Sequence, residues 1–285
     1  MENGESRMCI LNSKTFSSIM SAGLFLSSLA GFNNAFAAQA TEKENGESNK
    51  TTVNMVDGRN LVEKMHQKTS NLKSYSFKYK MKVFDTKKPV LENGSFYYNQ
   101  PNLIRLEEEG PYKKGAVAVL TREGHVKAHL GGGLKLFVVQ LSPDSKLLKS
   151  ANGHPMIESD FKSLTGYLKK YIKSNMSVNA SAQPIKTADF KEKVFLLEIH
   201  KSKNEKRIWK KIAVDPRTYL PLKWWDYNDR GKLHSVASWH QVTSYRQLPD
   251  ELFTIKQAKS VKNQIFNYAD GKNADKISKL STNGS

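Results

Sequence analysis

The segment YSFKYKMKVF, from Tyr75 to Phe84, alternates between apolar and polar side chains over its first nine residues. Side chains along a strand point in turn to opposite faces of the sheet. The alternation therefore predicts a strand with one apolar face, which either joins an ordinary core or lines a cavity, and one polar face rich in lysine. The apolar face carries Tyr75, Phe77, Tyr79, Met81 and Val83, and the polar face carries Ser76, Lys78, Lys80 and Lys82.

Short runs of strand-forming residues, separated by Gly, Pro and Asp turns, continue along the chain. They predict six strands between residues 75 and 141 and four more between residues 190 and 245. Helical periodicity predicts one helix that begins at Asp57 as its N-cap and runs to about Thr69, and a second over residues 157–173. The sequence therefore predicts a mainly β (α+β) fold. About ten antiparallel strands form one strongly curved sheet, and two or three helices cover its concave side.

The first 37 residues have the features of a secretory signal. Arg7 and Lys14 precede an uncharged run from Thr15 to Phe32, and Ala35-Phe36-Ala37 supplies the small residues of a cleavage site. The alternative is a retained membrane anchor, for which this serine-rich run is barely long enough. We expect cleavage after about Ala37, and a periplasmic or secreted protein. The predicted organisation is a signal peptide (1–37), a disordered leader (38–54), one folded domain (55–255) and a basic, loosely ordered tail (256–285).

Composition limits the chemistry that the mature chain can perform. Cys9 is the sole cysteine and leaves with the signal, which excludes disulfides, thiolate nucleophiles and zinc–thiolate sites. The formal net charge of the chain is +18, which favours anionic surfaces such as phospholipid headgroups or wall polymers. Because the lysines are scattered, a well-solvated basic surface explains them equally well. Export argues against a nucleic-acid partner.

The histidines and glycines show no catalytic pattern that is complete. His125 and His129 lie too far apart on a strand to share one zinc ion, so neither a metal nor another cofactor is expected. His154 and Glu158 could work as a general acid–base pair in a hydrolase, but no nucleophile motif accompanies them. The glycines at 131–133 lie between two predicted strands and do not open a helix, which argues against phosphate binding. We therefore expect no catalytic residue.

Aromatic side chains concentrate on the predicted strands, where they form either a core or the wall of a cavity. Ten strands closed around two helices leave interior space, in which an acyl chain would gain about 0.8 kcal/mol per buried methylene. Lysines at the rim would then meet an anionic headgroup. The cavity candidates are Tyr75, Phe77, Tyr79, Met81, Val83, Phe96, Tyr98 and Trp224, and the headgroup candidates are Lys78, Lys80 and Lys223.

Two stretches of the chain resemble known families. VDPRTYLPLKWWDYNDRGKLHSVASWHQV, followed by LPDELF, resembles the LolA/LolB superfamily of periplasmic lipoprotein carriers. The middle region, with AHLGG, LSPDS and HPMIE, resembles a bacterial family described only as a domain of unknown function. The first resemblance implies an unclosed antiparallel β-barrel with a helical lid over a hydrophobic cavity. The positions that match the superfamily pattern are Asp215, Pro221, Asp226, Gly231, Pro249 and Phe253.

Two functions remain open from the sequence. The first is an exported, non-catalytic carrier or sensor, expected to be a monomer, that binds a lipid or an acylated protein and works near anionic membranes. The second is an envelope interaction module with a filled core, which binds a protein partner or an anionic wall polymer. A cavity inside the sheet would favour the first function.

Overall fold

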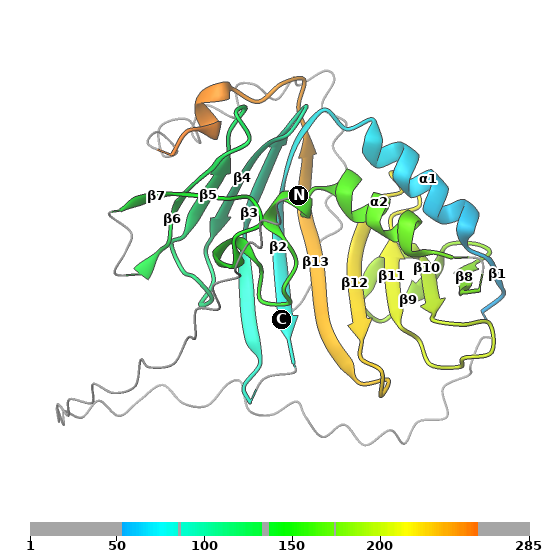
Figure 1. Cartoon of the computed structure of the whole chain (residues 1–285). Helices are drawn as coiled ribbons and strands as arrows, with labels where there is room; N and C mark the ends of the chain where they lie inside the picture. The colour runs from blue at the N-terminus through cyan, green and yellow to red at the C-terminus, as the bar shows by residue number, and fades with distance from the viewer. Residues whose placement is uncertain (1–52, 85–86, 133–136, 174, 256–285) are drawn as a thin grey trace, which may run out of the picture. The chain divides into compact units, whose positions relative to one another are not determined.

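A computed structural model describes residues 53–84, 87–132, 137–173 and 175–255 (Figure 1). The predicted signal peptide, residues 38–52 of the predicted leader and the predicted tail from residue 256 lie outside these residues. The described part is one antiparallel sheet with two α-helices. The helices are α1 (Arg59–Ser70) and α2 (Phe161–Tyr171), and the 3-10 helices are η2 (Lys146–Leu148), η3 (Met156–Glu158) and η4 (Asp250–Phe253).

The strand order across the sheet is β1-β8-β10-β11-β12-β13-β2-β3-β4-β5-β6-β7, and β9 pairs with β10. The two ends of this order do not pair with each other, so the sheet stays unclosed, as predicted. The first seven strands are β1 (Met55–Asp57), β2 (Ser74–Val83), β3 (Val90–Asn99), β4 (Leu103–Glu108), β5 (Val117–Leu120), β6 (Val126–His129) and β7 (Val138–Leu141). The others are β8 (Ser177–Ser181), β9 (Ile185–Thr187), β10 (Phe190–His200), β11 (Lys210–Val214), β12 (Pro221–Tyr227) and β13 (Leu233–Ser244).

The six strands predicted before the second helix are present, and so are the four predicted after it, which are β10 to β13. The short strands β1, β8 and β9 were not predicted, because their three to five residues carry only one or two apolar side chains each, too few for a period-2 signal. Strand β13 joins the two groups by pairing with β2, so residues far apart in sequence meet in the centre of the sheet.

Helix α1 begins one residue later than predicted, with Gly58 at the N-cap position. Asp57 instead ends β1, and its carboxylate accepts a hydrogen bond from the Arg59 backbone N–H at 3.0 Å. A Cβ at position 58 would lie 2.7 Å from the Leu197 side chain and 3.1 Å from a backbone carbon of Asn179, so the start of the helix packs closely on the sheet.

Helix α2 begins at Phe161, where Asp160 caps it by accepting from the Ser163 N–H at 3.0 Å. Both helices lie on one face of the sheet, next to strands β10 to β12 (Figure 1). Thr69 and Thr165 join them through a hydrogen bond of 2.7 Å between their hydroxyls. The main core includes side chains from both helices and from the same face of most strands.

Candidate functional site

A cavity of about 740 Å³ lies between this face of the sheet and the segments that cover it. Its volume is within the range of small-molecule binding sites. The apolar part of its wall includes Phe77, Tyr79, Met81, Phe96, Leu106, Ala118, Ala128, Leu148, Met156, Leu164, Trp209, Trp224, Ala237 and Trp239.

The strand register explains why space remains beside so many aromatic rings. Phe77 pairs with Phe96 across β2 and β3, and the same row continues through Leu106, Ala118 and Ala128. The row thus changes from two stacked rings, whose centroids are 4.7 Å apart, to the methyl groups of Ala118 and Ala128, before it reaches Val139 on β7. The two alanines leave the cavity unfilled above β5 and β6.

The cover over β2 to β6 is the segment between β7 and α2. Its turn is fixed by Ser150, whose hydroxyl bonds to the Asn152 side chain at 2.6 Å, and by His154, whose backbone N–H donates to both. The Lys113 ammonium donates to the backbone oxygens of Leu147 and Lys149, at 2.8 and 2.6 Å. These contacts attach the cover to the sheet side of the cavity.

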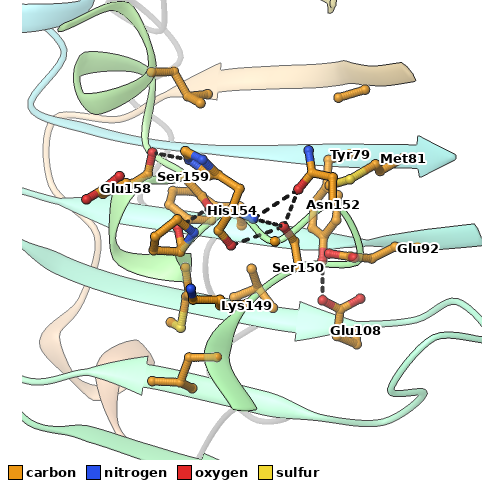
Figure 2. Close-up of a pocket in the computed structure, with 18 of the residues that line it drawn as sticks. Tyr79, Met81, Glu92, Glu108, Lys149, Ser150, Asn152, His154, Glu158 and Ser159 are labelled. Atoms are coloured by element: carbon orange, nitrogen blue, oxygen red, sulfur yellow. Dashed lines mark hydrogen bonds between the residues drawn. The ribbon is translucent and has the colours of Figure 1, made fainter. Parts of the chain in front are cut away.

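One polar group on the cavity wall is formed by Glu92, Glu108 and Tyr79 (Figure 2). The Tyr79 hydroxyl donates to Glu108 Oε1 at 2.7 Å, and the Ala151 N–H donates to Glu92 Oε2 at 2.6 Å. Both glutamates are buried, with exposed fractions of 2% for Glu92 and 6% for Glu108. Because Ala151 belongs to the cover segment, its hydrogen bond to the Glu92 carboxylate also holds that segment in place.

Burial and mutual repulsion change the acidity of these two carboxyls. Burial, and then the charge of Glu92, raises the pKa of Glu108 to about 8. Burial is also the main cause that raises the pKa of Glu92. The raised pKa of Glu108 favours its protonated form near neutral pH, in which it can donate to Glu92.

A second polar group lies on β11 and β12. The Lys210 ammonium forms an ion pair with Asp226 and lies over the rings of Trp209 and Trp224, 4.4 and 5.4 Å from their centroids. The Trp224 indole N–H and the Ser235 hydroxyl both donate to Asp226, at 3.1 and 3.3 Å. Strands β12 and β3 are three strand spacings apart, about 14 Å, so the two polar groups flank a mainly apolar floor.

Five of the eight predicted cavity residues line this cavity, namely Phe77, Tyr79, Met81, Phe96 and Trp224. The other three have different positions. The Tyr75 hydroxyl accepts from the Phe161 N–H at 2.9 Å and so positions α2, while the Tyr98 hydroxyl donates to the Pro101 oxygen at 3.0 Å. Val83 is buried near the end of β2 but is not part of the wall.

The three predicted headgroup lysines lie away from the cavity wall. Lys78 pairs with Glu109 at 2.6 Å, Lys80 is exposed on the same face of β2, and Lys223 pairs with Asp189. This face is opposite the one that carries Phe77 and Tyr79, because lysine and aromatic positions alternate along the strand. The lysines on the wall are Lys113, Lys149 and Lys210.

His154 and Glu158 both border the cavity (Figure 2). The His154 Nε2 atom lies 2.9 Å from the backbone oxygen of Glu158, and this contact closes the turn that leads into α2. Among the described residues, no three His, Cys, Asp or Glu side chains gather closely enough to hold a metal ion. No helix in the described ranges is long and apolar enough to cross a membrane.

Sequence reasoning missed the two wall glutamates, although a signal for them exists. Glu92 has the same parity on its strand as Phe96, and Glu108 the same as Leu106. Alternation therefore places a carboxyl on each apolar face, where an acidic residue is rare unless it has a partner or a function.

Comparisons with solved structures give likenesses at low identity. An uncharacterized conserved protein from Thermus thermophilus is 10% identical, with a TM-score of 0.43, over 71% of this chain and 96% of that one. LolA superfamily protein NE2245 from Nitrosomonas europaea is 12% identical, with a TM-score of 0.35, over 70% and 98%. The MucA/MucB complex from Pseudomonas aeruginosa gives 10% identity and a TM-score of 0.38, over 70% and 61%.

The LolA superfamily is thus present among the structural matches as well as in the sequence resemblance. No protein-family model and no curated protein matches the sequence. Identities this low and TM-scores below 0.5 do not by themselves indicate what the chain binds.

Proposed function

We propose that this chain is an exported, non-catalytic carrier or sensor that binds the acyl chain of a lipid or of an acylated protein. The observation that supports the proposal is the cavity of about 740 Å³, with a floor of aromatic, methionine and alanine side chains. Each methylene moved from water into such a site contributes about 0.8 kcal/mol. An envelope location, periplasmic or secreted, belongs to the same proposal and rests on residues 1–37.

The alternative interaction module was defined by a filled core, and the interior of this sheet is not filled. Alanines at positions 118 and 128 leave space where larger side chains of the same row would close it. The cavity therefore supports an apolar ligand over the module with a filled core that binds a protein partner or an anionic wall polymer.

Native mass spectrometry of protein purified without detergent tests the proposal. We expect an additional bound mass in the wild type, and uptake of a fluorescent fatty acid when that mass is removed. Ala128→Phe places a ring into the cavity and should reduce uptake at least about tenfold, because the ring occupies the volume the acyl chain requires.

The matched control is Lys127→Phe, which adds the same ring to the exposed face of the same strand. It should bind as the wild type does. Circular dichroism shows whether Ala128→Phe folds. If it does not, Ala118→Leu replaces it, because it fills the cavity with a smaller side chain. A wild type that is always empty and takes up no fatty acid would contradict the proposal, as would blocking variants that bind normally.

A further inference from the structure

Glu108 has an unused hydrogen-bond acceptor on the wall of the cavity. Its Oε1 atom accepts from Tyr79, whereas Oε2 is buried and has no donor among the described residues. Glu92 lies beside it and accepts from the Ala151 N–H through Oε2. The proton of Glu108 can join the two carboxyls, but without it the pair has more acceptors than the surrounding residues have donors, so a bound cation would replace this proton.

No cation of the described part of the chain neutralises this pair. None of the ion pairs found there includes Glu92 or Glu108. Lys113 is the basic side chain whose charge acts on both carboxyls, but its ammonium donates to the backbone oxygens of Leu147 and Lys149. Buried carboxyls are normally paired, so this pair has room for an additional cation.

The other polar group of the cavity differs in this respect. Lys210 and Asp226 neutralise each other, and Trp224 and Ser235 supply further donors to Asp226. A ligand headgroup would have to compete with these internal bonds. Among the described side chains of the cavity wall, the buried acceptor without a partner is Glu108 Oε2, on β4.

We propose that Glu92 and Glu108 bind the polar end of the ligand, and that this end is a primary ammonium group. The inference rests on the proposed function, because the acyl chain occupies the apolar floor over Phe77, Phe96 and Trp224. An ammonium has three donors and no acceptor, which complements two carboxyls. A carboxylate headgroup would instead place a third acidic group among two buried ones.

Binding of hexadecylamine and of hexadecanoic acid, which have equal chain lengths, tests this inference. We expect wild-type protein to bind the amine at least about tenfold more tightly, as charge-assisted hydrogen bonds provide. The double variant Glu92→Gln, Glu108→Gln should bind the two amphiphiles with similar affinity. The net charge of +18 favours the acid over the amine, so a preference for the amine requires a local cause.

Glu109→Gln is the matched control, because it removes a carboxylate of the next residue, which lies on the opposite face and accepts from Lys78 and Ser95. It should keep the preference for the amine. A double variant that keeps the preference would overturn the inference, as would a wild type that binds the acid equally well. In both cases the proposed function stands, whereas a wild type that binds neither amphiphile refutes both. The single variant Glu108→Gln serves if the double variant does not fold.

Discussion

Tyr79 reaches Glu108 across the strand between them because the intervening residue is Gly94. The three residues lie in one row of β2, β3 and β4. A Cβ at position 94 would lie 2.9 Å from the Tyr79 hydroxyl and 2.0 Å from the Glu107 backbone oxygen. A single missing side chain therefore allows the hydrogen bond that orients the buried carboxyl.

We expect Gly94→Ala to lower the free energy of unfolding by about 2 kcal/mol or more, because the clash is with backbone and cannot be relieved by a rotamer change. Urea unfolding followed by tryptophan fluorescence measures the loss. The control is Gly166→Ala in α2, where the added Cβ meets the His66 ring at an ordinary 3.4 Å and helix propensity improves. Equal stability of the two variants would contradict the explanation.

The carboxyl pair also predicts how folding stability depends on pH. The folded protein holds the Glu108 proton up to about pH 8, whereas the unfolded chain releases it near the ordinary pKa of 4.5. The folded state thus binds more protons between these values, so stability falls as pH rises from about 5 to about 8. Glu92, Tyr79 and Lys113 set the local field in which this titration occurs.

Glu108→Gln should remove most of this slope, because the amide stays neutral throughout the range. The melting temperature of the variant, measured at intervals from pH 5 to pH 8, should rise relative to that of the wild type as pH increases, because only the wild type loses stability over this range. Between pH 5 and pH 8, we expect the difference in free energy of unfolding between the two proteins to change by at least about 1 kcal/mol. Parallel curves would show that Glu108 ionises alike in the folded and unfolded chain.

At the scale of elements, β4 uses both of its faces. Ile104 and Leu106 contact the main core, while Leu103, Arg105 and Glu107 lie on the opposite face under the C-terminal segment 248–255. Arg105 is 1% exposed, forms an ion pair with Glu107 at 2.7 Å, and donates to the Leu252 and Thr254 oxygens at 3.1 and 2.9 Å. This segment thereby covers the outer face of the strand that carries Glu108.

Replacing Arg105 by Ala should cost about 3–5 kcal/mol, because it leaves a carboxylate in a buried position without its guanidinium. Urea unfolding gives the loss, and limited proteolysis should show earlier cleavage after residue 247. The double variant Arg105→Met, Glu107→Gln removes the buried charges together and should recover part of the stability. A single variant as stable as the wild type would show that the segment does not depend on this ion pair.

At the scale of the folded unit, the strand order is what produces an interior. Strands β13 and β2 pair in the centre of the sheet, and the two edge strands, β1 and β7, do not pair with each other. The helices and the cover segment lie on one face, and the space between the two layers is the cavity. The lysines of β2 lie on the opposite face, where they contribute to a charge of +18 for the whole chain.

That charge predicts association with membranes independent of the cavity. Vesicles that contain anionic phospholipid should bind the protein at least about tenfold more strongly than zwitterionic vesicles at low salt, and the difference should disappear at high salt. Co-sedimentation with each kind of vesicle, at low and at high salt, measures the binding. Ala128→Phe should associate as the wild type does, since it changes no charge. If the binding does not depend on salt, the association is due to apolar contacts and the prediction from charge is wrong.

The sequence by itself determined ten of the thirteen described strands, their two faces and the class of the fold. Period-2 alternation is local, so it can be read from Tyr75 to Val83 without knowing any neighbour. The same rule placed Phe77, Tyr79 and Phe96 on one face, and they meet there. It could not decide that the hydroxyl of Tyr75 would bond to the start of α2, because that partner is 86 residues away in the sequence.

The tertiary structure alone decided that a cavity remains and which groups border it. The cavity volume depends on the row from Phe77 to Ala128, to which five separate strands contribute. The polar groups of the cavity depend on the pairing of β3 with β4 and of β11 with β12. Glu92 and Glu108 become a pair only in this register. Local periodicity specifies the direction of each side chain, but strand order and register specify its neighbours, and the neighbours determine both the empty volume and the pKa values.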